Sequence, residues 1–587
     1  MEKWIVHTKK ADFAQWAQEL NIDPVVARII RNRDIETIEE ARSFLYGTTE
    51  DMHDPFLLKD MDKAVDIVME AVKTGKKIRV IGDYDVDGVT SSYILTRGIK
   101  SLGGDVSTAI PHRIHDGYGL NENLVEDAAA DGVQFIITCD NGISAVSQIE
   151  LAGSRGMEVI VTDHHEVPFE ILEDGSRKQI LPPALAVVNP KRYDDEYPFK
   201  SICGAMVTYK LMQAIVAKTG NKSLKSIMDE LLQFAAFGTV CDVMELKDEN
   251  RILVRNGIQK IKTAPNIGLR ALMEVNNLQP ENISNYHLGF VLGPCVNATG
   301  RLDTAITALE LMSADDYGSA LKAAAELKAL NDSRKDLTTE GVEKAEKYIE
   351  EHNLAEKSVW LIYLPDVHES IAGIIAGKIR EKHNHPVFVL TKTENGIKGS
   401  GRSIDAYHMQ AHLMEMSALL DKFGGHAMAA GLSLQEENLQ ELDRRLNENS
   451  GLTEEDYVAK IYIDVPMPTG YATLKLAKEI ENLEPFGMGN PHPMFAEKDL
   501  DILRIIPFGK EKQYSKLKVR NSSGGIVELT SFDHPGVFYD FVDNKYGSGS
   551  ADSLRDGTSS YKISILYQLS VNRFKEENTQ FMLKNYL

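Results

Sequence analysis

The sequence has few cysteines, and none of them form a pair at metal-binding spacing. The four cysteines, Cys139, Cys203, Cys241 and Cys295, lie far apart in the chain. Zinc ribbons and thiol redox motifs require a Cys-x-x-Cys pair, and a disulfide framework requires more cysteines in a shorter chain. We therefore expect four small buried side chains in a reducing cytoplasm.

Long apolar runs are also missing. No stretch stays apolar for the roughly 20 residues that a membrane-spanning helix needs. The first residues, MEKWIVHTKKADFAQWAQEL, lack the apolar core and the cleavage site of a secretory signal. We expect a cytoplasmic protein with no membrane segment.

Positive charge is in short supply. The chain has 65 lysines and arginines against 87 aspartates and glutamates, a formal net charge of −22. That balance counts against nucleic acid as a partner, because phosphates bind to basic surfaces. Residues 501–587, however, carry 12 basic against 10 acidic side chains. The charge balance therefore leaves open that a local basic surface binds nucleic acid, although the protein as a whole is acidic.

The pattern of apolar residues divides the 587-residue chain into regions of different fold. Residues 1–75 show helical spacing. From residue 76, strands alternate with helices, which is typical of βαβ crossovers and a parallel sheet. A polar stretch over 321–352 predicts a long exposed helix, and a second α/β segment starts at 358. Short alternating strands after residue 500 predict a small barrel.

Acidic and imidazole side chains follow the predicted strands. They are Asp83, Asp85 and Asp87 in "GDYDVDGVTSS", Asp140 in "TCDNGIS", Asp163, His164 and His165 in "VTDHHEVP", and Asp242 in "GTVCDVMEL". In an open parallel sheet, ligands bind outside the carboxyl ends of the strands. Any one aspartate taken singly is better explained as a helix N-cap or an Asx-turn. Clustered carboxylates repel one another, so the group as a whole favours a divalent metal of the manganese or zinc type.

These four motifs resemble those of the DHH phosphoesterase superfamily. "GGHAMAAGLSL" (424–434) resembles the glycine–histidine motif of its companion DHHA1 domain. Four further stretches narrow the resemblance: "IPHRIHDGYGL" (110–120), "LGPCVNATGRL" (292–302), "IKGSGRS" (397–403) and "LEPFGMGNPHPMF" (483–495). Together they resemble the bacterial RecJ family of single-strand-specific 5′→3′ DNA exonucleases, over almost the whole chain.

The resemblance implies an α/β fold. A parallel-sheet DHH domain (76–325) is linked by a long helix (326–355) to a smaller α/β DHHA1 domain (356–455). An N-terminal helical segment (1–75) packs on the DHH domain. A C-terminal OB-fold β-barrel (456–587) binds nucleic acid.

The resemblance also implies a site with two divalent metal ions, Mn²⁺ or Mg²⁺. The implied metal ligands are Asp83, Asp85, Asp87, Asp140, His164 and Asp242, of which Asp83 either binds an ion directly or hydrogen-bonds to a residue that does. Asp85 and Asp87 would bind different ions, and Asp140 would bridge them. His165 would act on the scissile phosphate, and Asp163 would orient a neighbouring side chain.

Substrate binding is assigned to a wider set of residues. They are Arg113, Arg301, Ser400 and Arg402 at the 5′-phosphate, His426, Lys516 and Lys518 along the DNA, and Asn297, which is assigned to substrate binding without a more specific place. The residues alone also allow surface ion pairs, a core histidine and a solvated strand face. The chain departs from the family at Cys295, where relatives commonly have arginine, which puts recognition of the terminal phosphate partly in question.

The implied function is a single-stranded-DNA-specific exonuclease that releases 5′-mononucleotides in DNA recombination and repair, including mismatch repair. A single-strand-binding protein and a helicase are the partners that the resemblance implies, and the protein would be a monomer. The alternatives are a DHH-family oligoribonuclease or nucleotide phosphatase, and a DHH scaffold that binds DNA without cutting it.

Overall fold

The computed structural model describes residues 2–112, 117–302, 304–555, 560–574 and 576–587. The chain divides into two compact units. The first consists chiefly of Asp54–Asp242 and Gly257–Ala459. The second consists of Trp4–His53, Val243–Asn256 and Lys460–Leu587. No helix of the described ranges combines the length and the apolar character needed to cross a membrane.

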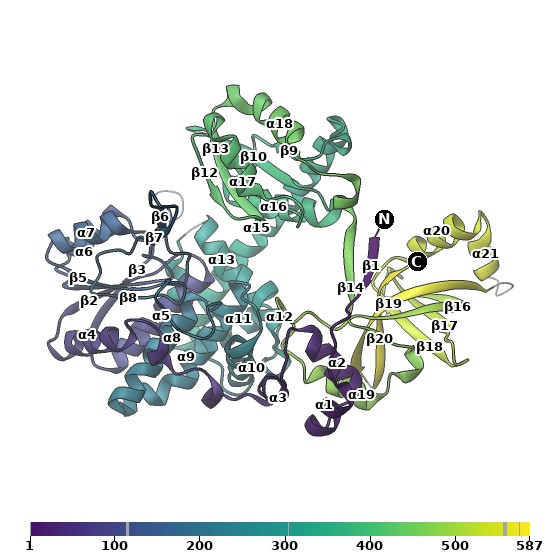
Figure 1. Cartoon of the computed structure of the whole chain (residues 1–587), viewed down its shortest axis with the longest axis horizontal. Helices are drawn as coiled ribbons and strands as arrows, with labels where there is room; N and C mark the ends of the chain where they lie inside the picture. Colours follow the sequence, from purple (N-terminus) through teal and green to yellow (C-terminus); the bar gives the residue numbers. More distant parts are fainter. Residues whose placement is uncertain (1, 113–116, 303, 556–559, 575) are drawn as a thin grey trace. The chain divides into compact units, whose positions relative to one another are not determined.

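A parallel five-stranded sheet forms the first part of unit 1, as the sequence predicts (Figure 1). Its strands are β2 (Lys77–Ile81), β3 (Asp105–Ala109), β4 (Phe135–Cys139), β5 (Glu158–Thr162) and β8 (Ala186–Val188), in the order β3-β2-β4-β5-β8. The carboxyl ends of β2, β4 and β5 therefore lie next to one another at one edge of the sheet.

Helices cover both faces of this sheet. On one face, α6 (Glu122–Ala130) and α7 (Val146–Ser154) bury Val125, Ala128, Ile149 and Ala152 against the strands. On the other lie α4 (Met61–Lys73), α5 (Val86–Ser101) and α8 (Gly204–Thr219), with α9 (Lys222–Cys241) packed on α5 and α8. Between β5 and β8 the chain forms a hairpin of β6 (Phe169–Ile171) and β7 (Arg177–Gln179).

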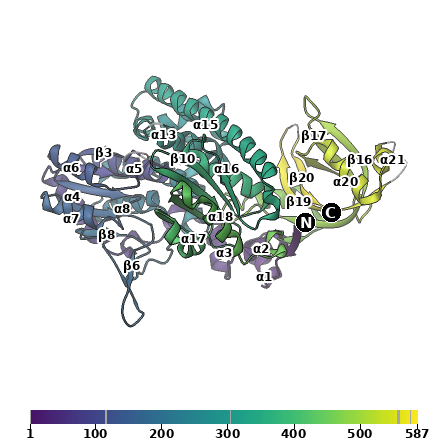
Figure 2. The same cartoon turned by 90° about the horizontal axis from the view of Figure 1, so that it is seen from above.

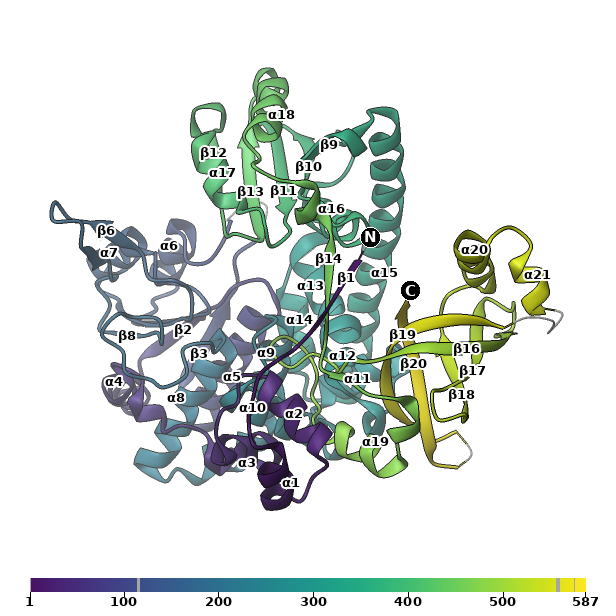
Figure 3. The ribbon, with the colours of Figure 1, turned by 45° about the vertical axis from the view of Figure 1, so that its right-hand side comes forward.

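The predicted long helix, α15, spans Tyr317–Glu351 and starts four residues before the polar stretch 321–352 that predicts it. The prediction that it is exposed is wrong on one face. Buried residues recur along it at helical spacing: Ala320, Ala324, Leu327, Asn331, Thr338, Gly341, Ala345 and Ile349. This face packs on α11 (Ile267–Val275), α13 (Gly293–Leu302), α14 (Ile306–Met312) and α16 (Glu369–His383) (Figure 3). Small and polar side chains make up most of the buried stripe, so hydrophobicity alone does not reveal it.

A second sheet completes unit 1. Its order is β12-β13-β11-β10-β9, from β12 (Lys422–Gly425), β13 (Ala429–Leu434), β11 (Gly396–Arg402), β10 (Val387–Thr393) and β9 (Trp360–Tyr363). Helix α16 packs between this sheet and α15 (Figure 2). On the other face lie α17 (Met409–Glu415) and α18 (Leu439–Glu448).

Unit 2 contains the predicted barrel. The sheet order is β15-β16-β17-β18-β20-β19, and pairing of β16 with β19 closes it. The strands are β15 (Val465–Pro466), β16 (Phe495–Phe508), β17 (Tyr514–Arg520), β18 (Ile526–Ser531), β19 (Tyr561–Asn572) and β20 (Asn578–Tyr586). Helices α19 (Leu474–Glu481), α20 (Pro535–Tyr546) and α21 (Ser550–Arg555) pack around it.

The N-terminal segment differs from the prediction. Residues Glu2–Val6 form a strand, β1, and helices α1 (Phe13–Leu20), α2 (Pro24–Asn32) and α3 (Ile38–Tyr46) belong to unit 2. Their side chains Trp16, Ile29 and Phe44 share a core with Leu476 and Ile480 of α19. Helix α4 packs on β8 and α8 of unit 1, and the Phe44 carbonyl in α3 accepts a hydrogen bond from Arg251, inside the predicted DHH range of 76–325. The packing of residues 1–75 as a whole on the DHH domain stays a prediction. Helical spacing shows that a helix has an apolar face but does not show what covers it.

Candidate active site

The loop after β2 places three carboxylates at the edge of the sheet. Asp85 is the N-cap of α5, and its Oδ1 accepts a hydrogen bond from the Gly88 N–H at 3.0 Å. Asp87, in the first turn of α5, accepts hydrogen bonds from the N–H groups of Gly204 (2.6 Å) and Ala205 (2.9 Å). These two backbone donors fix the orientation of the Asp87 carboxylate. The same loop can therefore cap helix α5 and place carboxylates at the edge of the sheet.

Asp140 is the first residue after β4 and has a left-handed backbone, with φ of 59°. For a residue other than glycine this conformation is uncommon, and such strain clusters at functional sites. Its Oδ1 is buried and has no hydrogen-bond partner among the described residues. His164 Nε2 lies 3.1 Å from that oxygen without hydrogen-bond geometry.

The adjacent histidines after β5 point in different directions, as the end of a strand allows. The His164 side chain is 8% exposed and faces the carboxylates, with Nε2 3.7 Å from Asp87 Oδ2 and 3.6 Å from Asp242 Oδ2. The His165 side chain is 42% exposed. Its Nδ1 lies 2.8 Å from Asp163 Oδ1. The two imidazoles therefore have different surroundings.

Asp163 is buried behind the histidines and holds the motif in place. Its carboxylate accepts hydrogen bonds from the N–H groups of Ile143 (2.9 Å), His164 (2.7 Å) and His165 (3.2 Å). With the His165 ring, these contacts use both carboxylate oxygens. Asp163 thus orients its neighbours rather than facing the cluster.

The structure brings together all six side chains predicted as metal ligands. In each of three groups the potential ligand atoms lie within 4.8 Å of one another. The groups are Asp83, Asp85 and Asp140; Asp87, His164 and Asp242; and Asp140, His164 and His165. The first two groups share no residue, so the geometry offers a separate ligand set for each of two ions.

Burial and mutual repulsion raise the pKa values of the carboxylates. The pKa of Asp83 rises to about 8 because the group is buried and Asp85 lies beside it. The pKa of Asp242 also rises to about 8, through burial and the charges of Asp87 and Asp85. Burial likewise raises the pKa values of Asp85 and Asp140. Ionising the whole set requires a compensating cation.

The two histidines have pKa shifts of opposite sign. Burial lowers the pKa of His164, so its ring is neutral at pH 7, as a metal ligand must be. Burial also acts to lower the pKa of His165, but the hydrogen bond and charge of Asp163 outweigh it and raise the value to about 9. His165 is therefore a cation with a proton to donate.

The donor set fits divalent metal. Carboxylate oxygens and one neutral imidazole suit Mn²⁺ and Mg²⁺ in number and type. Two carboxylate oxygens, Asp83 Oδ1 and Asp140 Oδ1, are buried without a hydrogen-bond partner in the described part of the chain. Such atoms are costly unless a cation or a proton satisfies them.

Sequence reasoning did not single out Tyr118. Its hydroxyl donates a hydrogen bond to the Asp140 carbonyl at 2.9 Å and lies 3.0 Å from His165 Nε2. The nearby Asn141 side chain accepts from the Leu120 N–H and donates to the Ile81 carbonyl, which ties this loop to the end of β2. Tyr118 lies in the stretch 110–120, which is one of those that resemble the RecJ family. That resemblance was the only feature of the sequence that pointed to this residue.

A pocket of about 310 Å³ adjoins the cluster. Tyr84 and Tyr118 line it from the DHH side, and Ser370, Lys398 and Ser400 line it from the second sheet and α16. Beside it, Arg301 Nη1 donates to the Ser370 carbonyl at 2.5 Å. The predicted residues Arg301 and Ser400 therefore meet at a pocket that shares Tyr118 with the carboxylate cluster.

The remaining predicted substrate residues lie elsewhere. Asn297 accepts a hydrogen bond from the Val86 N–H at 3.2 Å, inside the first motif. His426 is exposed in the turn between β12 and β13. Lys516 and Lys518 lie on β17 of unit 2, where Lys516 pairs with Glu528 at 2.6 Å. Arg113 falls outside the described residues.

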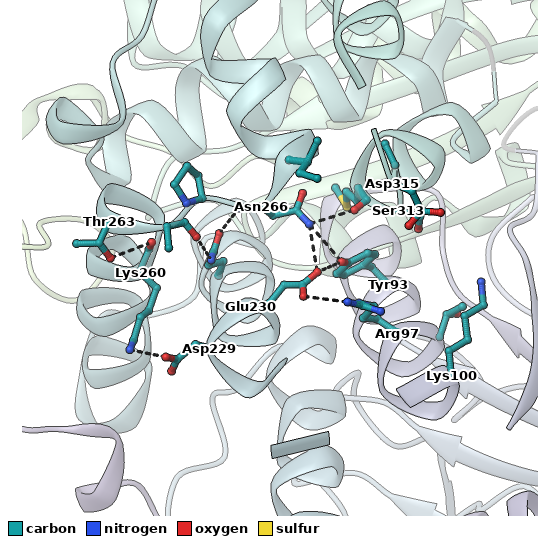
Figure 4. Close-up of a pocket in the computed structure, with 17 residues that line it drawn as sticks. Tyr93, Arg97, Lys100, Asp229, Glu230, Lys260, Thr263, Asn266, Ser313 and Asp315 are labelled. Carbon is teal, nitrogen blue, oxygen red and sulfur yellow. Dashed lines mark hydrogen bonds and ion pairs between the residues drawn. The ribbon is translucent and has the colours of Figure 1, made fainter. Parts of the chain in front are cut away.

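A cavity of about 630 Å³ contains none of the predicted site residues. Its polar groups bond to one another (Figure 4): the Tyr93 hydroxyl bonds to the Glu230 carboxylate, and the Asn266 amide lies 3.3 Å from both. Tyr93 is on α5 and Glu230 is on α9. The network therefore ties together two helices whose ends carry Asp85, Asp87 and Asp242.

Three protein-family models match the chain. The DHH family, N-terminal domain, matches residues 77–239; the DHHA1 domain matches 356–450; and the RecJ OB domain matches 463–585.

Curated relatives cover nearly the whole chain. It is 32% identical over 574 residues to the single-stranded-DNA-specific exonuclease RecJ of Bacillus subtilis (strain 168), covering 97% of this chain and 68% of that protein. It is 31% identical to RecJ of Haemophilus influenzae, covering 96% of each. The crystal structure of RecJ in complex with Mn²⁺ from Thermus thermophilus matches with a TM-score of 0.81 at 26% identity, covering 100% of this chain and 79% of that chain.

Proposed function

The chain belongs to the RecJ family of single-stranded-DNA-specific exonucleases, and from that premise we propose that it degrades single-stranded DNA from the 5′ end and releases 5′-mononucleotides. The observation that carries the proposal is the contact between two sites. Tyr118 bonds to Asp140 and His165 in the carboxylate cluster and also lines the pocket of about 310 Å³. A strand end held in that pocket places its first internal phosphodiester at the cluster.

The ligands of the two ions follow from the grouping of side chains. Asp83, Asp85 and Asp140 would hold one ion, and Asp87, His164 and Asp242 the other. RecJ structures from T. thermophilus contain Mn²⁺ and Mg²⁺. When bound, such ions neutralise the phosphate and lower the pKa of water, which favours its attack at neutral pH.

His165 supplies the proton that the leaving group needs. Hydrolysis forms a bond between a water oxygen and the phosphorus and breaks the bond from phosphorus to the 3′ oxygen of the first nucleotide. That oxygen leaves as a hydroxyl once it takes a proton. His165 is cationic and exposed, and Asp163 fixes its ring, so it suits the role of general acid. The shortened strand again carries a 5′-phosphate.

The pocket supplies the recognition of the strand end. Ser400 lines it, Arg301 bonds to the carbonyl of Ser370 in its wall, and Arg402 lies beside Ser400 on β11. Arginine suits a terminal phosphate because its planar fork can donate two parallel hydrogen bonds. Cys295 is fully buried and bonds to Val291 and Asn331, so its side chain takes no part in this recognition.

The unit 2 barrel is proposed to bind the DNA beyond the site. Its match to the RecJ OB domain and the basic side chains Lys516 and Lys518 on β17 support this. The domain limits given above for residues 76–325, 326–355, 356–455 and 456–587 belong to the same proposal. So do monomeric action in the cytoplasm, a role in recombination and repair, and cooperation with a single-strand-binding protein and a helicase.

The alternatives fit less well. A DNA-binding scaffold without activity would not need the ligand set, and here all six side chains are present and converge. A short-oligonucleotide RNase or a nucleotide phosphatase would not need a RecJ OB domain.

A strand-polarity assay tests the proposal. Single-stranded DNA labelled at either end is offered with Mn²⁺ or Mg²⁺, with the 5′ end phosphorylated or blocked, the 3′ end blocked, or the strand in a duplex. We expect 5′-mononucleotides from every single strand with a free 5′-phosphate, including the 3′-blocked one. Digestion that starts from the 3′ end, or equal digestion of duplex, would contradict the proposal.

A further inference from the structure

Helix α16 and strand β11 run side by side with matching spacing. Glu369 on α16 bonds to Lys398 on β11, with Oε2 and Nζ 2.7 Å apart. Four residues on, Gly373 faces Ser400, and four further on, Gly377 faces Arg402. Two strand residues rise about 6.8 Å and four helix residues about 6.0 Å, so the two elements stay in step. Lys398, Ser400 and Arg402 are therefore the β11 side chains that face the helix.

Two glycines make room for the side chain of Arg402. A Cβ at Gly377 would lie 3.9 Å from Arg402 Cγ, and a Cβ at Gly373 would lie 3.1 Å from Arg402 Nη2. The arginine stem thus passes Gly377, and its guanidinium reaches Gly373, one turn nearer the start of α16. That end of the helix carries Ser370, which lines the pocket. The guanidinium therefore points toward the pocket.

The guanidinium of Arg402 is held in place by packing rather than by an ion pair. Nη1 donates to the Gly401 carbonyl at 2.8 Å, and no carboxylate of the described residues pairs with it. Its charged neighbour is Arg380, and burial together with that like charge lowers the pKa of Arg402. A half-buried guanidinium that has a second cation beside it and no carboxylate partner is stabilised when an anion binds next to it.

We propose that Gly373 is a positioning residue for recognition of the terminal phosphate. Its missing Cβ leaves the space in which the guanidinium of Arg402 lies beside the hydroxyl of Ser400, a residue that lines the pocket. An added Cβ would lie 3.3 Å from Ser400 Cβ, 3.4 Å from Ser400 Oγ and 3.1 Å from Arg402 Nη2. The contacts with Arg402 Nη2 and Ser400 Cβ are tighter than ordinary van der Waals contact, so these groups or the helix would have to move by a few tenths of an ångström. The inference rests on the proposed function, because it gives Arg402 and Ser400 the role of binding the 5′-phosphate.

Gly377 provides a matched control. It lies on the same face of the same helix, one turn further on, and a Cβ there would lie at the ordinary contact distance of 3.9 Å. Alanine favours the helix at both positions, so neither substitution works against folding of α16. The two variants differ only in the contact that the new methyl group makes.

The test compares Gly373→Ala and Gly377→Ala in the full-length protein with Mn²⁺. The measured quantity is the ratio of kcat/KM for 5′-phosphorylated over 5′-hydroxyl single-stranded DNA, together with the melting temperature. We expect Gly373→Ala to lower the ratio at least tenfold, mainly through KM for the phosphorylated strand. We expect Gly377→Ala to keep the wild-type ratio within twofold.

A double-mutant cycle with Arg402→Ala separates positioning from general damage. If Gly373 acts through Arg402, Gly373→Ala has no further effect on the ratio once Arg402→Ala is present. Equal effects of Gly373→Ala in both backgrounds, a wild-type ratio for Gly373→Ala alone, or matching losses in both glycine variants would overturn the inference. A wild-type protein that does not distinguish the two strands would instead overturn the proposed end recognition itself.

Discussion

His164 and His165 are neighbours in the chain, but the protein gives them different protonation states. His164 is enclosed and neutral among carboxylates, while His165 is half-exposed and kept cationic by Asp163. The sequence predicts that the two side chains leave in different directions, because the strand ends at the sheet edge, but it does not predict their protonation. The role of Tyr118 is not predictable in this way. Its contacts depend on a loop that meets β4 and β5 only in the folded chain.

Asp163→Asn tests the support of His165. The asparagine keeps the size of the side chain but removes the charge that raises the pKa of His165. We expect kcat to fall about 10- to 100-fold, the usual cost of removing a carboxylate that supports a functional histidine. Asp174→Asn, in the exposed turn between β6 and β7, should leave kcat unchanged. Similar rates for wild type and Asp163→Asn would exclude this role.

His492 makes unit 2 sensitive to acid. Burial against Phe486 lowers its pKa to about 4, so the folded state takes up a proton only below that value. The unfolded state takes it up near pH 6.5. Stability is therefore lost as the pH falls from about 6.5 to about 4, by up to roughly 3 kcal/mol for this one group.

Urea unfolding of wild type and His492→Gln at several pH values measures the effect of His492. Glutamine does not titrate, so the variant should show a shallower loss of stability between pH 6.5 and pH 4. Parallel curves for the two proteins would show that His492 does not carry this pH dependence.

At the scale of elements, the strand ends were predictable and the helix faces were not. Runs such as "VQFIITC" and "MEVIVTD" mark buried parallel strands, and the polar residues after them mark the edge where ligands bind. The buried face of α15 was missed because alanine, glycine, asparagine and threonine form most of it. Close packing of a helix on its neighbours favours small side chains there, and a hydrophobicity pattern does not register them.

The start of α8 is fitted closely to the site. Gly204 donates its N–H to Asp87 Oδ2, and a Cβ on it would lie 2.6 Å from Asp140 Cβ. Gly204→Ala should push α8 away from Asp87 and Asp140, two proposed metal ligands, and lower kcat/KM with Mn²⁺ at least tenfold. Gly153→Ala in α7, where a Cβ meets nothing within 4 Å, should keep full activity. It should also gain at most about 1 kcal/mol from the helix preference of alanine. Full activity in Gly204→Ala would contradict the close fit between α8 and the metal ligands.

At the scale of the whole molecule, the sequence identifies the domains but not the position of the N-terminal helices. Motifs and strand patterns locate the DHH, DHHA1 and OB regions, because each carries its own local signal. Helices α1–α3 carry only an apolar face, which would suit several partners. Their attachment to the barrel unit depends on contacts between residues more than 400 positions apart, such as Arg33 with Asp464.

Arg33→Ala tests this attachment. Arg33 and Asp464 are both buried and pair at 2.6 Å, and Arg33 also donates to the Pro491 carbonyl. Removing the arginine leaves a buried carboxylate uncompensated, which costs about 3–5 kcal/mol. Arg31→Ala removes a pair with the exposed Glu36 and should cost no more than about 1 kcal/mol. Chemical unfolding followed by circular dichroism and tryptophan fluorescence compares them, and equal losses would contradict the docking of α1–α3 on the barrel.

The central claim is that the strand-end carboxylates and His164 form a two-ion hydrolytic centre, and Mn²⁺ binding to wild type and Asp140→Asn tests it most directly. Asparagine tolerates the left-handed backbone at this position, so the fold should be kept. Measured by calorimetry and by electron paramagnetic resonance, wild type should bind two Mn²⁺ ions per chain. Asp140→Asn should lose at least one of them, with an unchanged melting temperature of the metal-free protein. Wild type without bound Mn²⁺, or a variant that binds both ions as tightly as wild type, would contradict the account.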